Sequence, residues 1–135
     1  MTTGLQLSLP ATEAAIAQAR SAVEGLDGLD PHPDVCFTLR LLITELFTNA
    51  VKYGAMQEDA RIRLSLEVGE TFARAEVGDG GDGFLPDAVA MPDEDAESGR
   101  GLAFIDVLAD RWGVESNGEN CVWFELDLES ARSSD

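Results

Sequence analysis

Three short motifs in a fixed order contain the residue types needed to hold a nucleoside triphosphate and its metal ion. They are Glu45–Ala50 (ELFTNA), Asp79–Phe84 (DGGDGF) and Gly99–Leu102 (GRGL). In the first, a carboxylate and an amide stand one helical turn apart, so they can serve as a general base and a metal ligand. In the second, glycines let the backbone approach a ligand closely. In the third, a glycine pair before a helix can cradle phosphates.

The first motif places polar residues on one face of an otherwise apolar helix. Glu45, Asn49 and Lys52 fall at positions i, i+4 and i+7 and therefore share a face. A neutral Asn49 oxygen suits Mg²⁺ when phosphate oxygens and waters supply the other ligands. Glu45 could accept a proton from a hydroxyl or water that attacks the γ-phosphate. Taken alone, the same spacing also fits an amphipathic helix with solvated polar residues.

The second motif follows directly on a strand that we expect to end at Val77. A buried Asp79 carboxylate could accept a hydrogen bond from an exocyclic amine, which would select adenine over guanine. Gly81 and Gly83 would let the backbone approach the ligand with no Cβ in the way. Taken alone, an ordinary Asp-Gly turn explains the same residues.

The third motif opens a helix, and helix N-termini bind anions through free N–H groups and the helix dipole. Arg100, between Gly99 and Gly101, could add a charge-assisted contact to a phosphate. A plain helix entry capped by Ser98 is the structural alternative. The sequence has neither G-x-G-x-x-G nor G-x-x-x-x-G-K-[ST] at this motif, which excludes a Rossmann site and a P-loop there.

Hydrophobic periodicity predicts the elements that must position these motifs. Leu5 to Leu9 alternate as a strand, Thr12 and Asp34 are candidate N-caps of two helices, and Gly54 suits the end of the second helix. This order of elements predicts the α+β class: a two-layer α/β sandwich with helices on one face of a mixed, mostly antiparallel sheet. The expected ranges are strand 5–9, helix 12–26, helix 34–53, strands 62–68 and 73–77, helix 101–109, and strands 112–114 and 122–128.

Length and composition indicate one domain spanning residues 1–135. Without a span of roughly 20 apolar residues or a signal peptide, we expect a soluble, cytoplasmic protein with no membrane association. The net charge of −17 argues against direct nucleic-acid binding. It would suit a partner with a basic surface or serve only to keep the protein soluble, and charge alone does not choose between these. Cys36 and Cys121 lie in apolar contexts without C-x-x-C spacing, so buried free thiols are expected rather than a disulfide or metal site.

The three motifs together resemble the N box, G1 box and G2 box of the GHKL (Bergerat-fold) ATPases, which include gyrase, MutL and histidine kinases. The sequence is most similar to one branch of that family, the small bacterial anti-sigma factor serine kinases and their actinobacterial ATP-binding relatives. This similarity spans nearly the whole chain. The segments that carry it are LLITELFTNAVKYG (41–54), GRGLAFIDVLADRWGV (99–114) and VWFEL (122–126).

The resemblance implies roles for the matching positions. Asn49 would bind the Mg²⁺ that bridges the phosphates of ATP, Glu45 would be the catalytic base, and Asp79 would bind the adenine amine. Residues 84–98 would form a lid over the nucleotide. The other residues expected to bind the nucleotide are Lys52, Gly81, Gly83, Gly99, Arg100, Gly101 and Leu102.

The resemblance also implies an anti-sigma factor that is a Mg-ATP-dependent serine/threonine protein kinase. Such a protein would bind a sigma factor and phosphorylate an anti-anti-sigma (STAS-type) protein. A homodimer is also compatible with the resemblance. The alternative is an ATP-binding regulator without phosphotransfer. Two departures favour that alternative: the acidic stretch Asp93–Glu97 in the expected lid, and Tyr53 where the family often has His. We expect neither a detached histidine-kinase domain nor a gyrase-type ATPase, because we recognise no phospho-acceptor helix and no transducer domain in residues 1–135.

Overall fold

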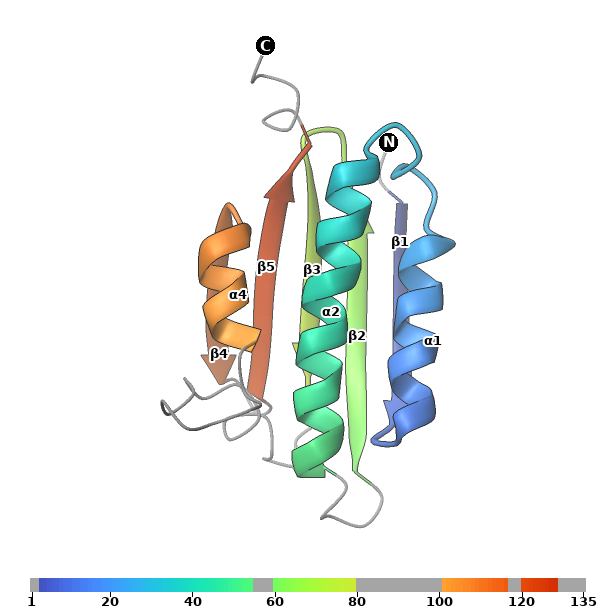
Figure 1. Ribbon diagram of the computed structural model, residues 1–135, viewed down its shortest axis with the longest axis vertical. Coiled ribbons are helices and arrows are strands. Elements are labelled where there is room, and N and C mark those ends of the chain that lie inside the picture. The colour runs from blue at the N-terminus through green and yellow to red at the C-terminus, as the bar shows by residue number, and fades with distance from the viewer. Residues whose placement is uncertain (1–2, 55–59, 80–100, 117–119, 129–135) are drawn as a thin grey trace.

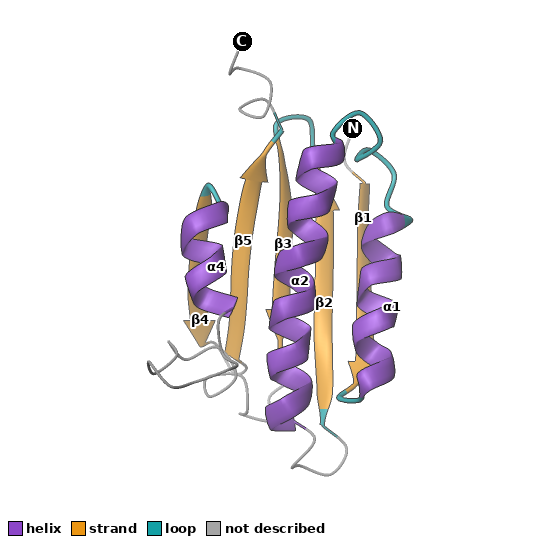
Figure 2. Cartoon of the chain, viewed as in Figure 1, coloured by secondary structure: helices purple, strands orange, loops and turns teal. Residues whose placement is uncertain are grey.

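The structure is a computed structural model that describes residues 3–54, 60–79, 101–116 and 120–128. Each element expected from the sequence is present, and Figure 2 shows the helices and strands in separate layers. The elements are β1 (Thr3–Pro10), α1 (Glu13–Glu24), α2 (Pro33–Gly54), β2 (Arg61–Val68), β3 (Phe72–Gly78), α4 (Gly101–Leu108), β4 (Arg111–Ser116) and β5 (Asn120–Asp127).

The five strands form one sheet in the order β1-β2-β3-β5-β4. All three labelled helices lie on the same face of this sheet (Figure 1), which confirms the predicted two-layer α+β sandwich. The sheet was expected to be mixed, but every pairing among the described strands is antiparallel. The reason is that β3 pairs with β5 instead of β4, so each neighbouring strand runs in the opposite direction.

Alternation along the strands decides which face the helices cover. In β2, Ile62 and Leu64 are buried while Arg61 and Arg63 are exposed. Small buried residues continue the inner face in β3, where α2 packs against the strand: Ala73, Ala75 and Val77. A period of two therefore separates an apolar inner face from a polar outer face.

Helix α2 supplies the helix side of the core through residues spaced three or four apart. Phe47 and Phe124 are the largest fully buried side chains described. Burying each large apolar side chain contributes roughly 1.5–3 kcal/mol. The buried stripe of α2 comprises Val35, Leu39, Leu42, Ile43, Leu46, Phe47, Ala50 and Val51.

The N-terminal boundary of one of the two capped helices differs from the expected cap. Helix α2 begins at Pro33, so Asp34 lies in its first turn instead of capping it. Proline suits this first position because its φ is already helical and its missing N–H is not needed. Thr12 does occupy the N-cap position of α1 with an extended backbone, but its side chain makes no capping hydrogen bond.

Both cysteines are free thiols, and both are half-buried where full burial was expected. Cys121 lies on the outer face of β5, with its Sγ 3.9 Å from an oxygen of Glu76. Within the ranges given above, no helix is long and apolar enough to cross a membrane.

Candidate nucleotide-binding site

The described parts of the three motifs lie at one end of the molecule. Figure 1 shows the C-terminal end of α2, the end of β3 and the start of α4 there, and α2 contacts both of the other elements. The fold therefore gathers residues that are about fifty positions apart in sequence, from Asn49 to Gly101. Asp79, directly after β3, comes from between them.

The polar face of α2 passes from partial to full burial. Glu45 is half-buried, and Asn49, one turn later, is only 1% exposed. Lys52 follows in the last turn and is exposed. The predicted shared face thus places the amide inside the protein and the lysine at its surface.

Asp79 is completely buried. Among the described residues, Asn49 and Asp79 are the only polar or charged side chains that are buried. Burying a charged or polar group is unfavourable unless hydrogen bonds or charges compensate it. These two buried residues are the ones assigned from the sequence to the magnesium ion and to the adenine ring.

Thr44 and Thr48, next to Glu45 and Asn49 on α2, use their hydroxyls within the helix itself. The Thr44 hydroxyl donates to the Arg40 carbonyl at 2.7 Å, and the Thr48 hydroxyl donates to the Thr44 carbonyl at 2.6 Å. Both hydroxyls are therefore bound to the backbone one turn earlier. Glu45 and Asn49 therefore remain the candidate ligands of the ELFTNA motif.

Gly101 is the first residue of α4 and Leu102 the second, as the third motif predicts. The structure describes no side chain for Leu102. The other glycines, Arg100 and the expected lid lie outside the described residues: Gly81, Gly83, Gly99, Arg100 and 84–98.

The donor set fits a magnesium ion that is held mainly through a nucleotide. No group of three or more His, Cys, Asp or Glu that could hold a metal occurs in the described ranges. Mg²⁺ is commonly bound through one or two protein ligands together with substrate phosphates and waters. The Asn49 oxygen can supply such a ligand, with the Glu45 carboxylate one turn away.

A comparison with protein families finds that the histidine kinase-like ATPase domain matches residues 9–126. The chain belongs to this family. The match includes every described element except most of β1 and the last residue of β5, and it contains Glu45, Asn49, Asp79 and Gly101. A comparison with curated proteins gives no match. The GHKL fold and ATP binding expected from the sequence agree with this family.

This histidine kinase-like ATPase domain also carries an ionic network that sequence reasoning missed. It lies on the outer face of the sheet, away from the helices. Arg74 Nη1 is 2.9 Å from Glu125 Oε2, and Arg111 Nε is 2.6 Å from Glu125 Oε1. Arg111 also pairs with Asp127, and the Arg74 guanidinium lies 4.4 Å from the Trp123 ring centroid.

The network joins β3, β5 and β4 of the ATPase domain. The hydrogen bond from Arg111 lowers the pKa of Glu125; burial opposes this shift and the hydrogen bond from Arg74 adds to it. Hydrogen bonds to Asp127 and then Glu125 raise the pKa of Arg111. Partial burial alone would lower the pKa of Arg74, but Glu125 and Glu76 raise it. The sequence shows the alternating charges along these strands. It does not show which charges pair, because pairing depends on the order of the strands in the sheet.

Proposed function

We propose that this protein is an anti-sigma factor with Mg-ATP-dependent serine/threonine protein kinase activity toward an anti-anti-sigma partner of the STAS type. The observation that carries the proposal is the burial of Asn49 and Asp79, the two buried polar side chains in the part of the chain that the structure describes. The family match and the resemblance of residues 41–54 and 99–114 to the anti-sigma kinase branch support it further.

Each described residue has a definite part in this proposal. Asn49 would hold the magnesium ion, Asp79 would accept a hydrogen bond from the adenine amine, and Lys52 would reach a phosphate from the exposed last turn of α2. Bound Mg-ATP supplies the γ-phosphoryl group. Glu45 accepts the proton of the partner's serine hydroxyl while that oxygen bonds to phosphorus and the bond to the leaving ADP breaks.

The half-burial of Glu45 suits this role, because the carboxylate stays accessible to a second protein while its helix is fixed by the core. The net charge of −17 supports a partner with a basic surface, here the sigma factor. A cytoplasmic location and a homodimer complete the proposal, and the homodimer comes from the sequence resemblance alone.

The alternative function is an ATP-binding regulator that sequesters its partner without phosphotransfer. The run Asp93–Glu97 has four carboxylates in five residues. Such a charge in the expected lid would repel a triphosphate. This charge favours the alternative, as does Tyr53 at the position where the family often has His.

The test is transfer of label from γ-labelled Mg-ATP to proteins in lysate of the source organism. Glu45→Ala should abolish transfer while changing the Kd for ATP less than about two-fold, because a general base acts only in the chemical step. Glu67→Ala, which removes an exposed carboxylate on β2, is the matched control and should transfer like wild type.

The outcomes separate the two candidates. A small protein that is labelled by the wild type and by Glu67→Ala but not by Glu45→Ala supports the kinase. Normal ATP binding by the wild type with no labelled protein supports the regulator. Loss of ATP binding in Glu45→Ala would contradict the role of Glu45 as a base.

A further inference from the structure

A second feature of the surface lies between the C-terminal end of α1 and the first half of α2. It is a groove of about 270 Å³. Leu26 and Leu29, which are almost fully buried, form its floor. Phe37 projects from α2 as its wall, and Glu24 and Asp30 stand at its rim.

Phe37 does not take part in the core. It is 59% exposed, although the stripe of α2 that faces the sheet is buried. Arg40 lies over its ring, 5.9 Å from the centroid, and Arg40 Nη1 is 3.1 Å from Glu24 Oε1. The aromatic ring is thus exposed beside an apolar floor, with the guanidinium held between the ring and a carboxylate.

The rim of the groove is acidic. The segment 24–34 contains no Lys or Arg. Arg40, the cation that lines the groove, is already paired with Glu24. Two exposed carboxylates line the groove, Asp30 and the Arg40-paired Glu24, and two more are exposed in the same segment, Asp27 and Asp34. An apolar floor inside an acidic rim is complementary to a bulky aliphatic side chain flanked by lysines or arginines.

We propose that this groove docks an amphipathic segment of a partner protein. The segment inserts one aliphatic side chain against Phe37 and the leucine floor, and its basic side chains face the acidic rim. The volume of about 270 Å³ lies near the lower end of the roughly 300–1,000 Å³ of small-molecule sites and is sufficient for an anchoring side chain at a protein interface.

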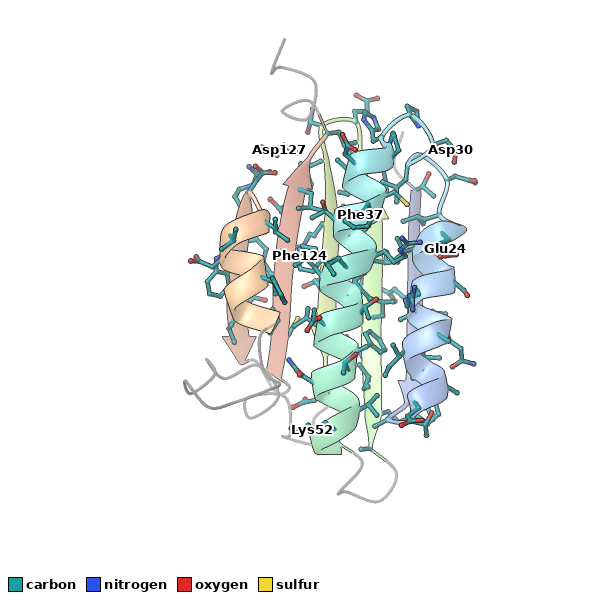
Figure 3. All side chains as sticks on the ribbon, viewed as in Figure 1. Glu24, Asp30, Phe37, Lys52, Phe124 and Asp127 are labelled. Atoms are coloured by element: carbon teal, nitrogen blue, oxygen red, sulfur yellow. The ribbon has the colours of Figure 1, made fainter. Side chains whose placement is uncertain are left out.

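This docking surface is separate from the nucleotide residues. Figure 3 shows Phe37 in the part of α2 nearer Glu24 and Asp30, with Lys52 at the opposite end of the helix. Fifteen residues of helix correspond to about 22 Å. The proposal goes beyond the function proposed above and stands whether or not the protein transfers phosphate.

The first experiment is a titration of the full chain with a synthetic helical peptide that has leucines on one face and lysines on the other. Calorimetry gives the affinity, and NMR shifts locate the contact. Phe37→Ala should weaken binding at least about ten-fold, as for a hot-spot residue. Val107→Ala is the matched control because Val107 is an exposed hydrophobic residue of α4, so this variant should bind like wild type.

Asp30→Lys provides a second variant that reverses charge at the rim without touching the floor. It should weaken the same peptide, and a peptide with glutamates replacing the lysines should not bind. Both Phe37→Ala and Asp30→Lys should keep the wild-type Kd for ATP. These variants therefore test the groove separately from the nucleotide site.

Four results would overturn the proposal. Equal binding by Phe37→Ala and wild type removes Phe37 from the interface. Equal binding of a peptide with alanines in place of leucines shows general charge attraction only. Shifts that map outside the groove place the contact elsewhere. If sedimentation shows a wild-type dimer that Phe37→Ala abolishes, the groove holds a second copy of this chain instead.

Discussion

Asp79→Asn is the sharpest test of the nucleotide site. The substitution keeps the size of the side chain and one acceptor oxygen but removes the charge and introduces an NH₂ donor. Because Asp79 is fully buried at the end of β3, solvent cannot compensate for the change. If Asp79 accepts a hydrogen bond from the adenine amine, the substitution acts directly on base recognition.

The expected magnitude follows from that hydrogen bond. A hydrogen bond to a charged group contributes about 1.5–3 kcal/mol, and each 1.4 kcal/mol is ten-fold in affinity. The Kd for ATP should therefore rise about ten- to a hundred-fold. Guanine presents a carbonyl oxygen where adenine has its amine, and the new amide can donate to that oxygen. The affinity for GTP should therefore stay constant or increase.

Calorimetry with Mg-ATP and Mg-GTP measures both affinities, and thermal unfolding reports on the fold. Asp27→Asn is the control because it removes the same charge from an exposed position. The preference for ATP over GTP is the decisive quantity, since a merely structural Asp79 would lower both affinities together. An unchanged preference, or an unchanged Kd for ATP, would refute the assignment to adenine.

Two further predictions concern the outer face of the sheet. Gly113→Ala should destabilise the protein by roughly 1–3 kcal/mol in denaturant unfolding, because the new Cβ would lie 2.8 Å from Trp123 Nε1. Gly4→Ala is the matched control: its Cβ would lie 3.4 Å from the nearest atom, so a similar loss there would contradict the steric argument. Glu125→Gln should cost roughly 1–2 kcal/mol at neutral pH, since it weakens bonds to Arg74 and to the exposed Arg111. The folded-state pKa of Glu125 lies below its ordinary 4.5, so this stabilisation is present above pH 4.5 and is lost as pH falls through the folded value. The difference from wild type in pH-dependent unfolding should therefore shrink in acid, and a difference that grows there would show that the charge is not responsible.

The type of each element could be predicted because local patterns suffice for it. Alternation at Ile62 and Leu64 predicts a strand of β2 with one buried face, and the spacing from Leu39 to Leu46 predicts a helix with an apolar stripe. The cap at Asp34 was wrong because Pro33 can itself begin a helix. A one-residue choice of this kind depends on the chain before the helix.

Long-range pairing could not be predicted in the same way. The sequence contains Arg111 and Glu125, but their proximity requires β4 to pair with β5 in the observed register. Arg74 reaches Glu125 only because β3 also neighbours β5. The sheet was expected to be mixed for the same reason, since strand order is a global property. The steric clash that a side chain at position 113 would make with Trp123 depends on the same register.

For the site, the sequence supplied residue types and the structure supplied their burial. Glu45, Asn49 and Lys52 were predicted to share a face, but spacing alone does not tell that Asn49 is inside the protein and Lys52 outside it. The hydrophobic periodicity of α2 likewise does not predict that the Phe37 side chain is exposed. Only the placement of α1 against α2 shows that the phenylalanine borders a groove rather than joining the core.

Charged and polar residues serve two different purposes in this fold. On the outer face, Glu125 is 13% exposed and paired with two arginines, so its charge is explained by the strands that it joins. Asn49 and Asp79 lie on the helix side, where apolar residues of similar size would pack more favourably. Strand and helix formation do not require an amide and a carboxylate there. A bound Mg-ATP would interact with both groups, and their burial is the reason we propose the nucleotide at this end of α2.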